Sequence, residues 1–293
     1  MHDASERPSG QIVRVVLCLI LIAYAAARLL EIFPNPVPRL TVVALDVLSA
    51  LAFALADGYR QLHLRSILVF AAICLVVGNL LENLSILTGF PFGHYYFLSL
   101  MGPKLLHVPV LLGFAYVGMA YVSWILGCLI VGSSQSASTR GRLVSVPLTA
   151  AFIMTAWDLA QDPVWATVLR GWIWRDGGPW FGVPISNYLG WYVTVFTIYV
   201  LFALYLRVNS AFDIPASPVR GRSALLFYVL CAAGNVCQIF SRGNALVVKD
   251  PTGQPWRVSD ILGASALVSV FVMGAFALLA WLKLRGEAAT PTD

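Results

Sequence analysis

The stretch from Ser66 to Phe97 reads SILVFAAICLVVGNLLENLSILTGFPFGHYYF. Its first part is an apolar run of about the length that crosses a bilayer as a helix, yet it carries Glu82 near its end. After Thr88 the run breaks into glycine, proline and five aromatic residues. A carboxylate in hydrocarbon is costly unless it is partnered or protonated, so this arrangement indicates a functional site rather than a simple membrane anchor.

A second stretch, from Ala156 to Trp191, reads AWDLAQDPVWATVLRGWIWRDGGPWFGVPISNYLGW and repeats the pattern. Asp158 and Asp162 are spaced i, i+4 on an apolar run, so they share one helix face. Asp162 also precedes a proline, and a cap on a broken helix is an equal alternative for it. Irregular backbone at membrane depth is tolerated only where it is buried or lines a cavity, so we expect the connection that follows to fold back.

The whole chain has the composition of a membrane protein. Of its 293 residues 59% are apolar and 11% are charged, whereas soluble domains are about half apolar and about a quarter charged. The net charge of +5 comes from basic residues that lie mainly between apolar runs. That distribution is typical of a polytopic protein in a lipid bilayer and predicts no nucleic-acid partner.

The apolar runs predict an all-α, polytopic integral membrane protein with about eight transmembrane helices. One run is short and contains Asp46, which leaves seven as the alternative. We expect a single transmembrane domain over residues 1–293, with flexible polar termini at 1–11 and 286–293. The predicted spans lie near residues 12–32, 40–57, 66–88, 105–132, 143–169, 185–207, 222–242 and 259–284.

The order of the spans places the unusual connections together. Two spans separate the third connection from the fifth, so both aromatic, glycine- and proline-rich stretches are predicted on one membrane face. The seventh connection, which contains KDPTGQPW, joins them. The N-terminal side carries eleven Lys and Arg residues and the other side eight, which favours both termini in the cytoplasm. We expect a bacterial inner membrane as the location.

The acids and rings together suggest proton chemistry on an apolar molecule. A protonated carboxyl can donate a proton, and aromatic faces can stabilise a carbocation. An interfacial aromatic belt would also explain the rings, but it does not require the interleaved glycines and prolines. The candidate acid/base residues are Glu82, Asp158 and Asp162, and the candidate pocket residues are Phe92, Tyr95, Tyr96, Trp172, Trp174, Phe181, Asn187 and Trp191.

The sequence gives little support for other chemistries. The four histidines form no H-x-x-H cluster and the five cysteines form no C-x-x-C pair, so no metal site is predicted. Asp158 and Asp162 would be only half of an aspartate-rich prenyltransferase site, and G-x-S-x-G and P-loop motifs are absent. We therefore expect no cofactor.

The segments ENLSILTGFPFGHYYF and MGP, with DLAQDPVW and GWIWRDGGPWFGVPISNYLGW, resemble the carotenoid biosynthesis membrane protein family. That family includes the carotenoid 1',2'-hydratases and the bisanhydrobacterioruberin hydratase, and the similarity runs from about Gly78 to Trp191. The resemblance implies addition of water across a terminal isoprenoid double bond of an acyclic carotenoid, which gives a tertiary alcohol. It also implies an apolar carotenoid and water as partners, with other enzymes of the pathway as further candidates.

Three hypotheses remain after the resemblance. In the hydratase, Glu82 and Asp158 are the preferred acid/base pair and Asp162 is the third candidate. A terpene or carotenoid cyclase or isomerase would share the protonation and the cation, but would lose a proton instead of gaining water. A lipid- or carotenoid-binding or transport protein is the non-enzymatic alternative. A transporter is expected to show two related halves with broken helices, and the sequence has no internal repeat.

Overall fold

The computed structural model describes residues 10–132, 139–209, 218–241, 243 and 245–289. Helices dominate these residues, which confirms the predicted all-α class. The helices are α1 (Gly10–Ile32), α2 (Arg39–Thr88), α3 (Val110–Val131), α4 (Thr139–Pro163), α5 (Ile185–Val208), α6 (Pro218–Cys237), α7 (Val258–Val268) and α8 (Gly274–Ala289). Short strands lie at β1 (Tyr95–Phe97), β2 (Lys104–Leu105), β3 (Val108–Pro109), β4 (Trp172–Trp174), β5 (Val247–Lys249) and β6 (Pro255–Arg257).

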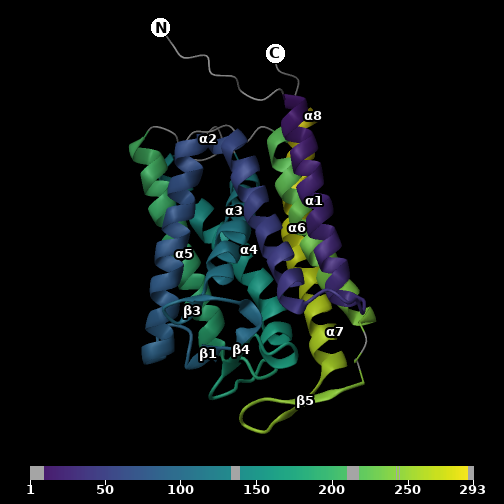
Figure 1. The fold of residues 1–293 in the computed structure, drawn as a ribbon. Coiled ribbons are helices and arrows are strands. Elements are labelled where there is room, and N and C mark those ends of the chain that lie inside the picture. Colours follow the sequence, from purple (N-terminus) through teal and green to yellow (C-terminus); the bar gives the residue numbers. More distant parts are fainter. Residues whose placement is uncertain (1–9, 133–138, 210–217, 242, 244, 290–293) are drawn as a thin grey trace.

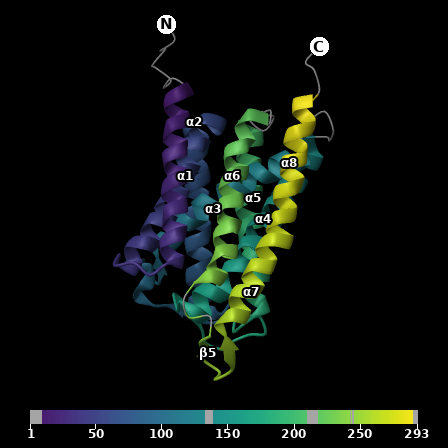
Figure 2. The same ribbon diagram turned by 90° about the vertical axis from the view of Figure 1, so that its right-hand side faces the viewer.

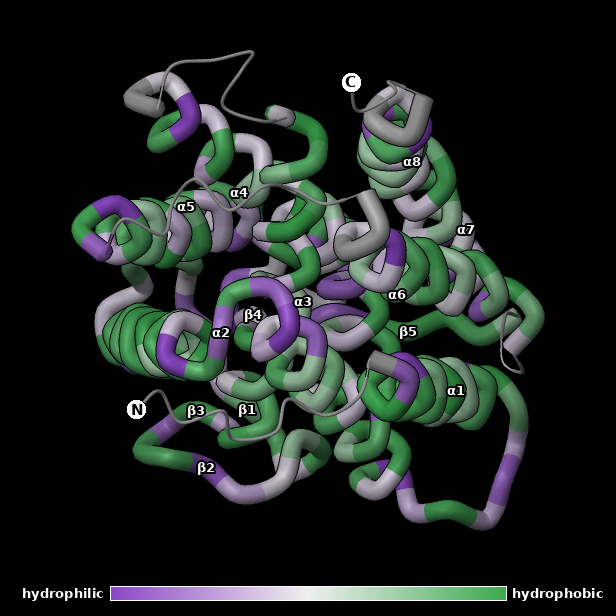
Figure 3. Tube along the Cα trace, turned by 90° about the horizontal axis from the view of Figure 1, so that it is seen from above, coloured by the Kyte–Doolittle hydropathy of each residue, from purple (hydrophilic) through white to green (hydrophobic). Residues whose placement is uncertain are grey.

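Within the described residues, seven helical rods are long and apolar enough to cross a membrane. A π-helical turn at Ser269–Met273 joins α7 to α8, so these two helices form one rod. Large apolar side chains such as Leu19, Leu80 and Phe271 are more than half exposed on the outside of the bundle. Seen from above, the tubes of the outer helices are mostly hydrophobic (Figure 3). A surface of this kind requires lipid as its surroundings, so the chain is an integral membrane protein.

Helix α2 folds back on itself. His63 has φ 66° and ψ 157°, which breaks the helix in its middle. A Cβ on Gly58 would lie 2.5 Å from Ile67 Cδ1, a distance that only a tight hairpin allows. Each half is about 36 Å long at 1.5 Å per residue, enough for a separate crossing. Six rods cross the membrane once, and the two halves of α2 each cross it once. The total agrees with the predicted eight spans (Figure 1).

A buried carboxylate holds this hairpin in place. Asp57 is fully buried and accepts hydrogen bonds from Arg60 Nη2 at 2.6 Å and from Tyr121 Oη on α3 at 2.7 Å. It also accepts one from Ser223 Oγ on α6 at 2.9 Å, and one from Gln61 Nε2. The carboxylate therefore links the turn of α2 to two other helices, which satisfies a charge that would otherwise be costly inside the bundle.

We expect Asp57→Ala to destabilise the fold by about 3 kcal/mol, because three donors besides Arg60 lose their acceptor. Reversible unfolding in mixed micelles measures the change, and Asp176→Ala, on an exposed loop, serves as the control. A loss of stability no larger than that of the control would show that the Asp57 cluster does not hold the hairpin.

Helix α3 is the centre of the bundle. In its most apolar stretch 72% of the residues are buried, against 28% in the corresponding stretch of α1. Tyr116, Tyr121 and Trp124 on this helix are almost completely buried. It packs against α2, α4, α6 and α8. Figure 2 shows α1, α6 and the α7–α8 rod standing on the side of the bundle that faces the viewer there. The polar groups of α3 are therefore available only to ligands inside the protein.

The connections that contain the strands gather at one end of the bundle, and helix α1 begins and helix α8 ends at the other (Figure 1). We call this end the loop face; its described residues are 33–38, 89–109, 169–184, 241, 243 and 245–257. The prediction that the third, fifth and seventh connections share a face is confirmed. Of the residues predicted as flexible termini, 10–11 belong to helix α1 and 286–289 to helix α8, whereas 1–9 and 290–293 lie outside the described residues.

Candidate functional site

The two motif stretches are joined by a β-ribbon on the loop face. Strand β1 pairs antiparallel with β4 in the register Tyr95 to Trp174 and Phe97 to Trp172. Successive side chains of a strand point to opposite faces, so these four rings share one face of the ribbon. That face is turned toward the ends of the membrane helices, and Tyr95, Phe97 and Trp174 are buried.

Small polar residues fix the loop that precedes β1. Gly89 ends α2 with φ 82°, and its N–H donates to Ser85 O at 2.7 Å. Ser85 Oγ accepts from Phe92 N at 3.1 Å and donates to Gly93 O at 2.9 Å. Ser186 Oγ on α5 donates to Phe92 O at 2.8 Å. These bonds explain how the glycine- and proline-rich loop brings Phe92 into the protein.

Glu82 lies at the inner end of this arrangement and is 3% exposed. Tyr116 Oη on α3 donates a hydrogen bond to Glu82 Oε1 at 2.6 Å, and Tyr95 Oη donates to Glu82 Oε2. Burial, followed by the charge of Glu82, raises the pKa of the Tyr95 phenol well above its ordinary value. The phenol therefore remains a donor, and both carboxylate oxygens of Glu82 are held as acceptors.

Asp158 and Asp162 face Glu82 from α4, and one amide binds both. Asn187 Nδ2 on α5 donates to Asp162 Oδ2 at 2.5 Å and to Asp158 Oδ2 at 3.2 Å. The two oxygens are therefore less than about 6 Å apart, where the repulsion between two buried charges is strong. Asp162 Oδ1 accepts a second hydrogen bond from Trp172 Nε1 at 2.7 Å. Asp158, Asp162 and Asn187 are at least 96% buried, whereas Trp172 is partly exposed.

The acids from the two stretches meet at a small cavity of about 30 Å³. Such a volume holds one or two water molecules but no isoprenoid group. Tyr116 stacks on Trp191 with ring centroids 4.5 Å apart and an interplanar angle of 5°. The cavity is lined by Glu82, Phe92, Tyr95, Phe97, Leu112, Asp162, Trp172, Trp174, Asn187 and Trp191.

The structure places eight of the eleven predicted residues at the cavity and leaves three outside its lining. Tyr96 points away from the cavity because it lies between Tyr95 and Phe97 on a strand; it is 41% exposed and carries Arg175 over its ring. Phe181 packs against Trp256 instead, with centroids 5.4 Å apart. Phe181 has φ 52° and lies in the turn before α5, and its ring is directed toward the seventh connection. Asp158 shares the Asn187 amide with Asp162 but is not among the residues that line the cavity.

Sequence reasoning missed Tyr116, Phe97 and Leu112. Tyr116 belongs to a nearly continuous apolar run with no acid near it. A phenol in the middle of a buried membrane helix needs a hydrogen-bond acceptor, and this requirement was the one available signal. Nothing in the sequence indicates that the acceptor is Glu82.

The seventh connection supports the site from outside. A Cβ on Gly177 would lie 2.8 Å from Thr252 Cγ2, and one on Gly182 would lie 3.1 Å from Asp250 Cβ. Burial opposes ionisation of Asp250, but hydrogen bonds from Thr252 and Trp256 outweigh it, and its pKa is lowered. The β5–β6 hairpin therefore rests on the turn that leads from β4 to α5.

The fold and the site define a helical integral membrane protein with buried acids and aromatic rings around a small cavity. The chain belongs to the carotenoid biosynthesis protein family, whose model matches residues 41–248, more than half of its length. The matched region contains every residue that lines the cavity. The family places the chain in carotenoid biosynthesis.

A curated relative is the bisanhydrobacterioruberin hydratase of Haloarcula japonica, which is 31% identical over 123 residues. The match covers 42% of this chain and 40% of the relative, so the chain spans less than half of that protein's length. No solved structure matches the chain.

Proposed function

We propose that the protein is a carotenoid hydratase that adds water to a terminal isoprenoid C=C bond of an acyclic carotenoid end group. The supporting observation is the cavity itself, where Glu82 and Asp162 face a space of water size between aromatic rings. The family and the name of the Haloarcula relative agree with this chemistry. The space for water beside the acids favours hydration over the alternative of cyclisation, which requires that water be kept out.

The proton comes from the Asp158–Asp162 pair in this proposal. Two carboxylates less than about 6 Å apart in a buried site favour sharing one proton, and Asp162 is the member that reaches the cavity. The proton adds to the less substituted alkene carbon, and the π electrons form the new C–H bond. A tertiary carbocation remains on the neighbouring carbon.

Glu82 acts as the base on the opposite side. Its two phenol donors favour the carboxylate form, which can accept a proton from water. The water oxygen bonds to the tertiary carbon, its proton passes to Glu82, and a tertiary alcohol results. Proton exchange through water then returns the proton to the aspartate pair. The ring faces of Trp191 and Trp174 border the cavity and stabilise the cation while it exists.

The substrate end must enlarge the cavity to reach the acids. The loop around Phe92 is the element placed to move, because Phe92 lines the cavity and lies between α2 and α5. A Cβ on Gly190 would lie 2.7 Å from Phe92 Cδ1, so α5 has no spare room behind the loop. We propose that the carotenoid enters from the bilayer at the loop face. The excess of basic residues at the other end supports cytoplasmic termini in a bacterial inner membrane.

Expression in bacteria that accumulate lycopene tests the function. Liquid chromatography with mass spectrometry should show a product heavier by one water, with the absorption spectrum of the polyene unchanged. A new product of unchanged mass would contradict hydration and support the cyclase or isomerase. Unaltered pigment, from membranes that contain the folded protein, would support the non-enzymatic binding or transport role.

Replacement of Tyr116 by Phe tests the role given to Glu82. We expect hydration to slow about tenfold, because Glu82 loses one of two phenol donors worth about 1.4 kcal/mol. Tyr192→Phe, a half-buried phenol outside the cavity, should leave turnover unchanged. Initial rates in membranes with equal protein content provide the comparison, and equal rates for Tyr116→Phe and the wild type would contradict the assignment.

A further inference from the structure

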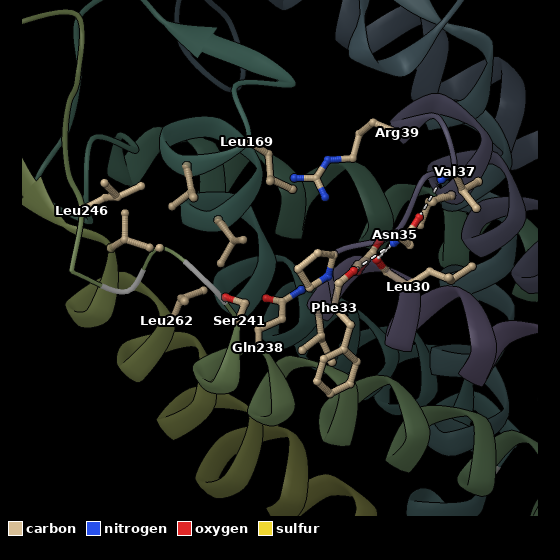
Figure 4. A pocket seen from close by; sticks show the side chains of 18 of the residues that line it. Leu30, Phe33, Asn35, Val37, Arg39, Leu169, Gln238, Ser241, Leu246 and Leu262 are labelled. Carbon is tan, nitrogen blue, oxygen red and sulfur yellow. Dashed lines mark hydrogen bonds between the residues drawn. The ribbon is translucent and has the colours of Figure 1, made fainter.

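A second and larger hollow opens on the loop face. It measures about 470 Å³, within the usual range for small-molecule sites, and lies between the ends of α1, α4 and α6 and the start of α7. We call it the α1/α6 groove (Figure 4). Its walls are mostly apolar, and they include Leu30, Ile32, Phe33, Val37, Val42, Val164, Val168, Leu169, Leu246, Val248, Val258 and Leu262.

Polar acceptors lie at the inner end of these apolar walls. Gln238 is 6% exposed, and its Oε1 has no hydrogen-bond partner among the described residues. Figure 4 shows its carboxamide in the middle of the groove, between Ser241 and Phe33. Glu31 also lines the groove, and its Oε1 lacks a partner within the same set of residues. Unpaired buried acceptors are uncommon, and they are usually satisfied by water or a ligand.

The position of Glu31 is fixed from behind. Arg28 Nη1 donates to Glu31 Oε2 at 2.6 Å, and Arg28 Nη2 donates to Asn235 Oδ1 on α6 at 2.6 Å. These charged contacts tie α1 to α6 along the floor of the groove, so its acceptors belong to a rigid part of the bundle. Arg39, in contrast, is exposed at the rim, where its guanidinium extends toward Leu169 (Figure 4).

One segment of chain separates the groove from the acid site. Asp162 and Trp172 line the small cavity, whereas Val164, Val168 and Leu169 line the groove. The wall between them is the π-helical turn Val164–Val168, a form often found at functional sites. Trp165, within this turn, stacks on Trp172 at 6.0 Å with an interplanar angle of 1°.

We propose that the α1/α6 groove binds the hydroxylated end of a long apolar isoprenoid chain. Apolar walls match the chain, and a hydroxyl group donates to one of the unpaired acceptors. A phospholipid is less well suited, because its anionic group would stay near Arg39 and its acyl chain would leave the inner acceptors unpaired. The identity of the ligand as the hydrated carotenoid end rests on the proposed function.

Binding of two short isoprenoids to the full-length protein in nanodiscs tests the proposal. Dihydromyrcenol carries a tertiary hydroxyl group, and citronellene is the alkene that differs from it by one water. We expect Gln238→Leu to weaken dihydromyrcenol binding about tenfold, the effect of one lost hydrogen bond, and to leave citronellene binding unchanged. Gln254→Leu makes the same replacement at an exposed loop position and should change neither. Equilibrium dialysis with mass spectrometry measures both ligands.

The outcomes separate this site from the hydratase. Equal binding of the alcohol to wild type and Gln238→Leu overturns the groove proposal, even if the protein hydrates lycopene. Gln238-dependent binding of the alcohol supports the groove even in a protein that fails to hydrate, and then only the hydratase is lost. If phosphatidylglycerol binding depends on both Arg39 and Gln238 and dihydromyrcenol binding depends on neither, the groove is a phospholipid site and the proposal is wrong.

Discussion

Replacement of Asp162 by Asn is expected to lower the rate of carotenoid hydration by about 10³-fold. An amide of the same size still accepts a hydrogen bond from Trp172, but it has no proton to donate to the alkene. General acid catalysis contributes about 10²–10⁴-fold to enzyme rates, and the cation cannot form without it. Product formed per mole of protein in isolated membranes gives the rate.

Two further variants make this result specific. Asp176→Asn changes an exposed acid of the same connection and should keep the wild-type rate. Asp158→Asn should slow the reaction less than Asp162→Asn, because Asp162 lines the cavity and Asp158 does not. If Asp158→Asn were the more damaging change in equally stable proteins, Asp158 rather than Asp162 would be the proton donor, and Glu82 and Asp158 would be the acid/base pair that the sequence favoured.

Replacement of Glu82 by Gln is expected to lower the rate by about 10²-fold or more, because the attacking water loses the base that accepts its proton. The amide must also accommodate two phenol donors with a single acceptor oxygen, so the geometry of Tyr95 and Tyr116 is disturbed. Alkene protonation can still occur, and a deuterated solvent should therefore reveal label exchange into unreacted substrate.

The exchange result distinguishes a base from a merely structural residue. Asp260→Asn, at an exposed acid of helix α7, is the matched control for charge removal. A Glu82→Gln protein that unfolds like the wild type but hydrates at more than a tenth of its rate would exclude Glu82 as the base.

The sequence predicts the membrane class, the span number and the common face of the unusual connections. Spans of about 20 apolar residues are set by bilayer thickness, and the alternation of faces follows from their order. The hairpin within α2 is consistent with two separately predicted spans, although its turn at His63 carries neither glycine nor proline. Its hydrogen bonds to Asp57 involve residues far along the chain, which no local pattern reveals.

The sequence predicts the acids of the candidate site but not which aromatic rings face them. Acids within apolar runs identify Glu82, Asp158 and Asp162 as candidates, because burial of a charge is costly without a partner or a function, although Asp57 is a buried acid with a structural role. The pairing of β1 with β4 decides which rings face the acids, and so separates Tyr95 from Tyr96. This pairing joins connections about 75 residues apart by three-residue strands, too short for a periodicity to be recognised. The groove at Gln238 depends on helix ends from four parts of the chain and leaves no sequence signature.

Incorporation of isotopes from water labelled with both deuterium and oxygen-18 tests the central claim most directly. The purified protein is reconstituted in lipid, supplied with lycopene, and the extracted pigment is analysed by mass spectrometry. Hydration predicts a product with one carbon-bound deuterium and one oxygen-18 in a tertiary hydroxyl group, formed by the wild type and not by Asp162→Asn. A product that contains deuterium without oxygen-18 would contradict the account, because the cation would then have lost a proton instead of capturing water.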